Sequence, residues 1–319
     1  MQLIGSEGLK RKMIQSMNQA TREQLKWKAS EGTFDLRDAV SSLIASYLTP
    51  KLISNLKPET QAELIDHFKA FNIDWFRSPF APFTWKIIYK VLKARREAMQ
   101  LIKEALKKRK ESREKHGDFL DTLLEDMEKE DSIYDEASVI NLLLIIGVVS
   151  KDTTSVATAL MVNLLSKNPK VLAELKVINE SLRLSNLGSI LFRKALKDVE
   201  IKGELFDIQF PRDGSWPLHH LWFTITLKYM RIRWSSIHGD GRDLSGRGKI
   251  LRSVTKTLMV FGGGTRQCVG ADFARLQMTV FLYHLVTTYD FVVVQECEMT
   301  RTPLPCFTKD LLINISPTL

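Results

Sequence analysis

The 319-residue sequence has few cysteines, no apolar run long enough to span a bilayer and no dedicated patch of one charge, and each absence excludes a class of protein. Three cysteines exclude a disulfide scaffold, and the odd number leaves at least one thiol free or ligating. The longest apolar run, 139–149, is too short to span a bilayer and is closed by Lys151 and Asp152. The first residues lack the apolar stretch of a signal peptide or anchor. Taken alone, the sequence is typical of a soluble protein.

The charge is positive but dispersed. The chain has 46 Lys+Arg against 37 Asp+Glu, a formal net charge of +9. A content of 44% hydrophobic and 26% charged residues excludes wholesale disorder. Because the basic residues form no dedicated patch, a nucleic-acid partner is not expected, and a basic binding module is the least supported hypothesis.

Helical periodicity covers most of the first two thirds of the chain. The segment 135–167 is apolar around most of its circumference, which predicts a buried central helix. Other helices are expected at 35–48, 60–71, 83–110, 118–130, 171–184 and 266–289, an extended segment and turn at 195–203, and strands at 291–294 and 311–315. The pattern therefore predicts a mainly α fold with small β elements.

The most informative segment is Phe-Gly-Gly-Gly-Thr-Arg-Gln-Cys-Val-Gly, residues 261–270. Three consecutive glycines let the backbone pass close to a flat, bulky group. Cys268 comes just before an expected helix, where free N–H groups and the helix dipole favour a thiolate, and Arg266 can hold an anionic group. These features suit a thiolate that ligates a large planar metallocofactor. The alternative is a buried cysteine beside a glycine-rich turn.

The pattern Phe-x-x-Gly-x-Arg-x-Cys-x-Gly resembles the signature of the haem-thiolate monooxygenases, the cytochrome P450 family. The resemblance implies that the cofactor is haem b, an iron protoporphyrin with an axial thiolate. Cys268 would be the metal ligand and Arg266 would pair with a haem propionate. Phe261, Gly262 and Gly270 would complete the cofactor-binding loop.

Two further patterns support the resemblance. Glu180 and Arg183, three apart on one helix face, are similar to the structural clamp that family members have beneath the haem, and Arg193 resembles a second propionate ligand. Asp152 and Thr153 in the central helix are similar to the acid and alcohol that relay protons to the bound oxygen. Lys151 is an unusual neighbour for that pair, and Val149 and Ser150 replace the usual small residues.

The implied function is hydroxylation of an apolar isoprenoid, triterpenoid-like or sterol-like, as in plant members of the family. Dioxygen, an apolar small-molecule substrate and an NADPH-dependent reductase would be the partners, with haem between the central helix and the cysteine loop. Phe307 and Leu304 would lie on a turn that lines the substrate pocket. Family members are anchored in the endoplasmic reticulum membrane, whereas no anchor is visible here, which leaves a cytoplasmic location open.

Three departures from the family pattern predict an incomplete haem-thiolate domain over 1–319. The N-terminal anchor and first sheet are missing, a block of helices is skipped after Lys176, and the segment 209–242 does not match the expected meander. One back-translation of 234–242, TGG AGT TCA ATC CAT GGA GAT GGG AGG, gives Glu-Phe-Asn-Pro-Trp-Arg-Trp-Glu, the missing meander, when read from its third nucleotide. The hypothesis is a frame-shifted segment, and the alternative is a divergent insertion. An inactive haem-binding remnant or a misassembled gene product is therefore the alternative function.

Overall fold

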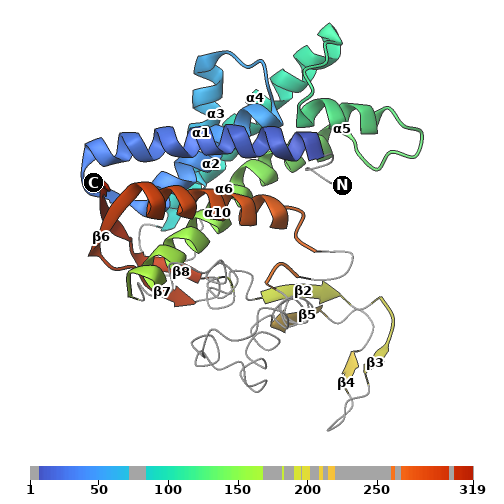
Figure 1. Ribbon diagram of the computed structural model, residues 1–319. Coiled ribbons are helices and arrows are strands. Elements are labelled where there is room, and N and C mark those ends of the chain that lie inside the picture. Colours follow the sequence, from blue (N-terminus) through green and yellow to red (C-terminus); the bar gives the residue numbers. More distant parts are fainter. Residues whose placement is uncertain are drawn as a thin grey trace. The chain divides into compact units, whose positions relative to one another are not determined.

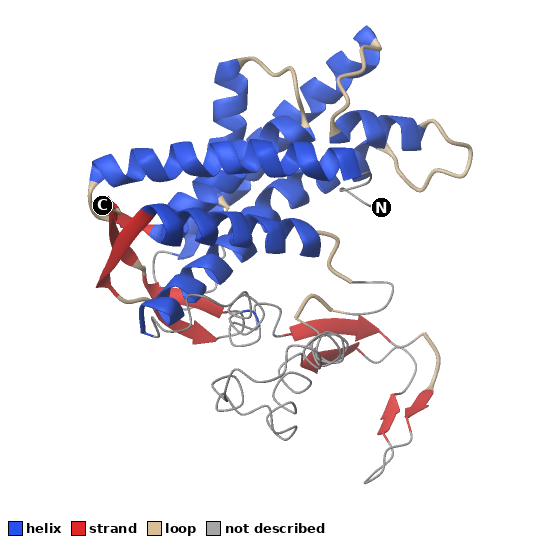
Figure 2. Cartoon of the chain, viewed as in Figure 1, coloured by secondary structure: helices blue, strands red, loops and turns tan. Residues whose placement is uncertain are grey.

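The computed structural model describes residues 7–71, 84–167, 182, 190–194, 196–201, 208–210, 215–219, 260–262, 267–301 and 305–318. The chain divides into two compact units. The first comprises Met1–Ser181, Val269–Thr300 and Cys306–Leu319, and the second comprises Leu182–Cys268 and Arg301–Pro305. The described part of the first unit is mainly helical, and that of the second contains short strands (Figure 2). The interpretation of 1–319 as one haem-thiolate domain stays a prediction.

The helices of the first unit are labelled in Figure 1. They are α1 (Glu7–Glu31), α2 (Leu36–Leu52), α3 (Pro58–Ala70), α4 (Thr84–Ser112), α5 (Phe119–Met127), α6 (Glu136–Lys167) and α10 (Ala271–Thr288). Local chemistry sets several of their ends. The Asp35 carboxylate accepts a hydrogen bond from the Arg37 amide at 2.8 Å and so caps α2, while Pro58 occupies the first turn of α3, where its missing N–H costs nothing. The mainly α expectation is confirmed.

Helix α6 is the centre of the first unit. It packs along α2, and its apolar side chains join those of α2, α3, α4 and α5 in one core cluster. Phe68 of α3 lies so close to Gly147 that a Cβ on Gly147 would meet the ring at 2.5 Å. Among the described helices, α6 is the one whose length and composition would allow it to cross a bilayer, and more than half of that apolar stretch is buried inside the protein. The burial is typical of a core helix.

A three-stranded antiparallel sheet closes the helical unit, with strand order β1 (Phe34–Asp35), β9 (Leu312–Pro317), β6 (Tyr289–Gln295). Phe34 and Val293 both pair with Ile313, which is fully buried. A second ladder joins β7 (Glu298–Arg301) and β8 (Pro305–Lys309). The strands expected at 291–294 and 311–315 are confirmed as β6 and β9.

A buried ionic cluster joins the end of α4 to the start of α5. The Arg109 guanidinium donates to Asp118 Oδ2 at 2.9 Å and also contacts the Asp121 carboxylate. Asp118 Oδ2 accepts from the Ser54 amide at 2.7 Å, and Asp121 Oδ2 accepts from the Gly117 amide at 2.7 Å. The cluster therefore fixes the α4–α5 loop against the end of α2.

The described part of the second unit contains two antiparallel ladders. β2 (Ile190–Lys194) pairs with β5 (Ser215–His219), and β3 (Val199–Ile201) pairs with β4 (Ile208–Phe210). The extended segment expected at 195–203 is confirmed by β3. Strand β5 and the end of β4 lie inside the segment 209–242, for which a frame-shifted or irregular segment was hypothesised. Residues 211–214 and 220–242 lie outside the described part, and the hypothesis stays a prediction.

One helix boundary and one whole helix differ from expectation. Helix α10 begins at Ala271, whereas the sequence predicted a start at 266. Helix α1 was not predicted, although Met17, Thr21 and Leu25, spaced four residues apart, are its buried face. The helix expected at 171–184 lies outside the described residues except for Leu182.

Candidate functional site

The cysteine loop is held by a backbone hydrogen bond between two signature residues. The Cys268 amide donates to the Phe261 carbonyl oxygen at 2.8 Å, which closes the loop. Gly262 has φ +73°, a left-handed conformation that glycine adopts without cost. The Cys268 thiol is free and exposed. The loop thus presents a sulfur that can ligate a metal, while Arg266 lies outside the described residues.

Gly270 connects this loop to α10. It is the N-cap of that helix, and its side-chain-free backbone leaves the first-turn N–H groups without a side-chain partner. The Gly270 carbonyl already accepts from the Ala274 amide at 2.8 Å, so regular helix starts directly after it. Cys268 therefore lies just before a helix N-terminus, as the cysteine motif predicted, although the periodicity had placed the start of the helix at 266.

An exposed apolar stripe lies on α6. Ile145 and Val149 have 56% and 50% of their surface exposed, although most of α6 is buried. Thr153 continues the same four-residue spacing, and its hydroxyl donates to the Val149 carbonyl at 3.0 Å. The α6 stripe, Ile145–Val149–Thr153, therefore combines an apolar surface with one accessible hydroxyl. Its four-residue spacing is visible in the sequence, where Val149 and Thr153 had been singled out for other reasons and Ile145 had not.

Asp152 is buried on α6 and paired with its neighbour. Asp152 has 8% of its surface exposed, and its carboxylate forms an ion pair with Lys151, which has 1% of its surface exposed. The Lys151 ammonium also donates to the Phe71 carbonyl oxygen at 2.6 Å, at the end of α3. Burial lowers the pKa of Lys151, and the Asp152 carboxylate opposes that shift. Lys151, which is an unusual neighbour in the family pattern, thus pairs with the Asp152 carboxylate, the acid of the expected proton relay.

At the two α6 positions where the family pattern has small residues, this chain has Val149 and Ser150. Ser150, at one of the small-residue positions, donates its hydroxyl to the Ile146 carbonyl at 2.6 Å. The glycine nearest in the sequence, Gly147, is covered by the Phe68 ring. The close packing of α3 on α6 therefore uses Gly147 for helix contact.

The remaining expected site residues are placed only in part. Arg193 lies in β2, opposite Trp216 of β5, and its side chain is not described. Glu180, Arg183 and Leu304 lie outside the described residues. Phe307 lies in strand β8, not in a turn, and it is fully buried with the Arg37 guanidinium 5.7 Å from its ring centre. The expectation of a turn at Phe307 is therefore wrong.

Within the described residues, no group of three or more His, Cys, Asp or Glu side chains is placed to hold a metal ion. Binding of a metal by a single protein thiolate, with the other ligands supplied by a planar cofactor, is compatible with that finding. The accessible Cys268 thiol and the glycine-containing loop fit such a cofactor.

Comparison with solved structures defines the fold class. A cyanobacterial CYP120A1 with bound retinoic acid superposes with a TM-score of 0.73 and 17% identity over 97% of this chain and 75% of that one. CYP109Q5 from Chondromyces apiculatus gives a TM-score of 0.71 and 17% identity over 98% of this chain and 74% of that one. The chain has a cytochrome P450 fold.

Sequence comparison shows the family. The cytochrome P450 family model matches residues 6–176 and 175–317, and cytochrome P450 708A2 of Arabidopsis thaliana is 46% identical over 100% of this chain and 72% of its own length. Cucurbitadienol 11-hydroxylase of Siraitia grosvenorii is 24% identical over 98% of this chain and 71% of its own length. The chain belongs to the cytochrome P450 family of monooxygenases, which implies haem, dioxygen, a substrate and a reductase partner. The two matched segments meet at Lys176, where the sequence predicted a skipped block.

Proposed function

We propose that the chain is a haem-dependent monooxygenase that hydroxylates an apolar isoprenoid of the triterpenoid or sterol class. The observation that carries the proposal is the Cys268 loop, in which an exposed thiol lies just before a helix and is fixed by a hydrogen bond to Phe261. The substrate class is supported by relatives, among them cucurbitadienol 11-hydroxylase and a β-amyrin 16α-hydroxylase of Maesa lanceolata.

Haem b fits the residues that are described. Cys268 would be its axial ligand, and Phe261, Gly262 and Gly270 would shape the loop around it. Arg193 and Arg266 would hold the propionates, and Glu180 with Arg183 would form the supporting clamp. When bound, haem supplies the activation of dioxygen, and the protein supplies ligation, orientation and exclusion of water.

Asp152 and Thr153 would manage protons in this reaction. The Thr153 hydroxyl is half-buried and presently donates to the Val149 carbonyl, so it can exchange a proton with solvent or substrate without a backbone change. The Lys151 ammonium pairs with the buried Asp152 carboxylate and holds it in place beside Thr153. Ile145 and Val149 would provide an apolar surface that suits an isoprenoid substrate.

Electrons would come from an NADPH-dependent reductase, and the complete protein would be located at the endoplasmic reticulum membrane. An inactive haem-binding remnant is the second candidate. It is favoured by one observation, namely that the family match is in two segments that meet at Lys176. Sequencing the transcript through codons 176–243 separates the two, because an in-frame block and meander favour the enzyme, and the sequence as written favours the remnant.

The ligand assignment is tested with Cys268→Ala. On the haem-bound fraction of the protein, this change should abolish the red-shifted absorbance of the reduced, carbon-monoxide-bound form, because that band requires thiolate ligation. Cys297→Ala is the matched control. Burial raises the pKa of Cys297 to about 11, so its thiol stays protonated near neutral pH and should not ligate the iron. A red-shifted band that survives Cys268→Ala would overturn the assignment.

A further inference from the structure

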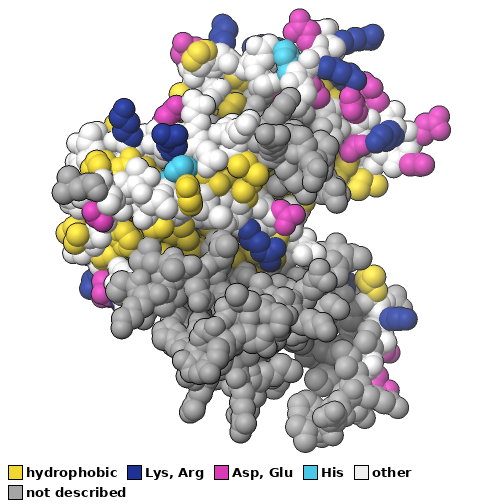
Figure 3. All heavy atoms as spheres, viewed as in Figure 1, with side chains coloured by type: hydrophobic (Ala, Val, Ile, Leu, Met, Phe, Trp, Pro, Cys, Tyr) yellow, Lys and Arg dark blue, Asp and Glu magenta, His cyan; other side chains and the backbone are white. Residues whose placement is uncertain are grey.

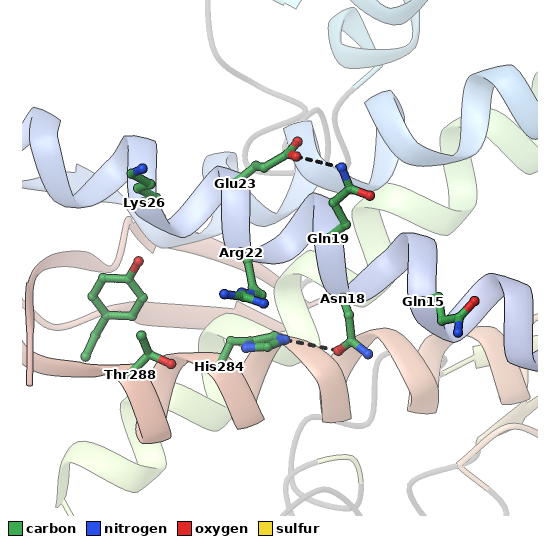
Figure 4. Close-up of a pocket in the computed structure, with 9 residues that line it drawn as sticks. Gln15, Asn18, Gln19, Arg22, Glu23, Lys26, His284 and Thr288 are labelled. Carbon is green, nitrogen blue, oxygen red and sulfur yellow. Dashed lines mark hydrogen bonds between the residues drawn. The ribbon is translucent and has the colours of Figure 1, made fainter.

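A groove of about 590 Å³ lies between α1 and α10, which run side by side (Figures 1 and 4). Its volume is within the range of small-molecule sites. Polar side chains line it from both helices and from the start of β6: Asn18, Arg22, Lys26, His284, Thr288 and Tyr289. Asn18, Arg22 and Lys26 follow a four-residue spacing along α1, and His284 and Thr288 follow the same spacing along α10.

One hydrogen bond crosses the groove. A ring nitrogen of His284, Nε2, lies 3.0 Å from the Asn18 side-chain oxygen, and the ring is half-buried. Arg22 points from α1 toward this histidine (Figure 4). Burial lowers the pKa of His284, and the Arg22 charge lowers it further. The local field is therefore positive at the point where the two helices meet.

Arg22 and Lys26 have no ion pair or hydrogen bond within the described part of the chain. They are one helical turn apart, so their like charges repel each other. The nearby Glu23 carboxylate is directed away from His284, and it accepts a hydrogen bond from the Gln19 amide at 2.9 Å (Figure 4). Basic side chains lie beside a histidine over α1 and α10 in the surface view (Figure 3). The groove thus combines unpaired cations with uncharged hydrogen-bond donors.

We propose that the α1–α10 groove binds the oxyanion group, carboxylate or phosphate, of a small molecule. The planar Arg22 guanidinium can donate two parallel hydrogen bonds to such a group. Lys26, one turn further along α1, adds charge, and the Asn18 amide and Thr288 hydroxyl add neutral donors at other points along the groove. An anion here would also relieve the repulsion between Arg22 and Lys26. The site is independent of the haem chemistry.

The test is isothermal titration calorimetry of the full chain with inorganic phosphate and, separately, with citrate, at low ionic strength. We expect saturable binding of at least one of the two. Arg22→Gln should weaken it about tenfold or more, since a hydrogen bond to a charged group is lost, and Lys26→Gln should weaken it less. Arg95→Gln is the matched control because Arg95 is an exposed arginine of α4, away from the groove.

Each outcome of the titration decides something. Binding of phosphate alone assigns a phosphate-bearing ligand, and binding of citrate alone assigns a carboxylate-bearing one. Binding of both supports the oxyanion class. No saturable binding of either anion, or equal losses in Arg22→Gln and Arg95→Gln, overturns the proposal. Circular dichroism of each variant checks the fold, and Lys26→Gln is the second test of the groove if Arg22→Gln should unfold.

Discussion

Lys151 is a charged side chain almost without solvent contact, and its position has an energetic consequence. A buried ammonium is tolerated only when it is paired and hydrogen-bonded. Here the Asp152 carboxylate and the Phe71 carbonyl together serve that purpose. The ion pair need not stabilise the fold overall, but the loss of one partner leaves the charge of the other buried and unpaired, away from water.

We expect Lys151→Met to lower the free energy of unfolding by roughly 3–5 kcal/mol, the usual cost of removing one partner from a buried ion pair. The double change Lys151→Met with Asp152→Asn should recover most of the loss, because both charges are then gone. Urea unfolding measures both. Lys107→Met is the control, since the Lys107 side chain is 76% exposed and should contribute less than about 0.5 kcal/mol. A Lys151→Met variant as stable as the control would contradict the buried pair.

At the residue scale, the sequence singled out Cys268 as the expected thiolate ligand because a dense motif of glycine, arginine and cysteine leaves few alternatives. The role of Lys151 could not be predicted. Its partner Phe71 is 80 positions away, and the contact exists only because α3 ends against α6. Ile145 and Val149 also required the structure, since nothing local distinguishes an exposed apolar residue of α6 from a buried one.

At the element scale, the Arg109–Asp118–Asp121 cluster sets the geometry of the α4–α5 connection. Burial opposes ionisation of Asp118, but hydrogen bonds from Arg109 and Ser54 outweigh it, so the pKa of Asp118 lies below 3.8. The cluster therefore contributes stability that is fully present above the pKa of an unfolded aspartate and is lost as pH falls through the lowered, folded-state pKa.

The expected result is a fall in the urea midpoint of unfolding below about pH 4, near the ordinary aspartate pKa. Asp118→Asn should reduce stability at pH 7 by about 1.5–3 kcal/mol, because hydrogen bonds to a charged group are weakened. Asp118→Asn should also make the fall in the urea midpoint at acidic pH smaller than in the wild type. Asp131→Asn, at an exposed aspartate, should retain the wild-type profile. Parallel profiles for wild type and Asp118→Asn would contradict this role.

Element-level prediction succeeded where periodicity was strong and local. Helices α2 to α6 and strands β6 and β9 follow from the apolar spacing and from breakers such as Pro58. Strands β2 and β5 were not predicted. Their paired residues are about 25 positions apart along the chain, so the local pattern does not show that they pair. Helix α1 was missed because its apolar residues are separated by many polar ones, so that its period is weak in a short window.

At the scale of the whole molecule, the cytochrome P450 family model matches the chain in two segments, 6–176 and 175–317, which meet near Lys176. The helical unit is nevertheless well packed around α6. The core cluster around α6 is built from α2 to α6, and its packing therefore does not require the block that the sequence analysis predicts to be skipped.

We expect the chain as written to bind less than one haem per molecule when it is expressed with a haem precursor, and to show little reductase-dependent turnover. The reason is that the sequence as written has no counterpart of the meander Arg that the family resemblance places beside the proposed Glu180–Arg183 clamp. Haem content and soluble yield measure this directly. A chimaera that carries the corresponding block and meander of the Arabidopsis thaliana relative is the matched comparison and should bind haem more fully. Stoichiometric haem in the chain as written would show that the block is dispensable.

The contrast between two thiols has a use in chemical labelling. Only the thiolate form of cysteine reacts quickly with alkylating reagents, and reaction also requires access. Cys268 is exposed, whereas partial burial raises the pKa of Cys297 to about 11. Of these two residues, iodoacetamide near neutral pH should modify Cys268 first, as peptide mass spectrometry would show. Ligation of the sulfur to iron would block that reaction, so alkylation of Cys268 becomes a count of the molecules that lack haem.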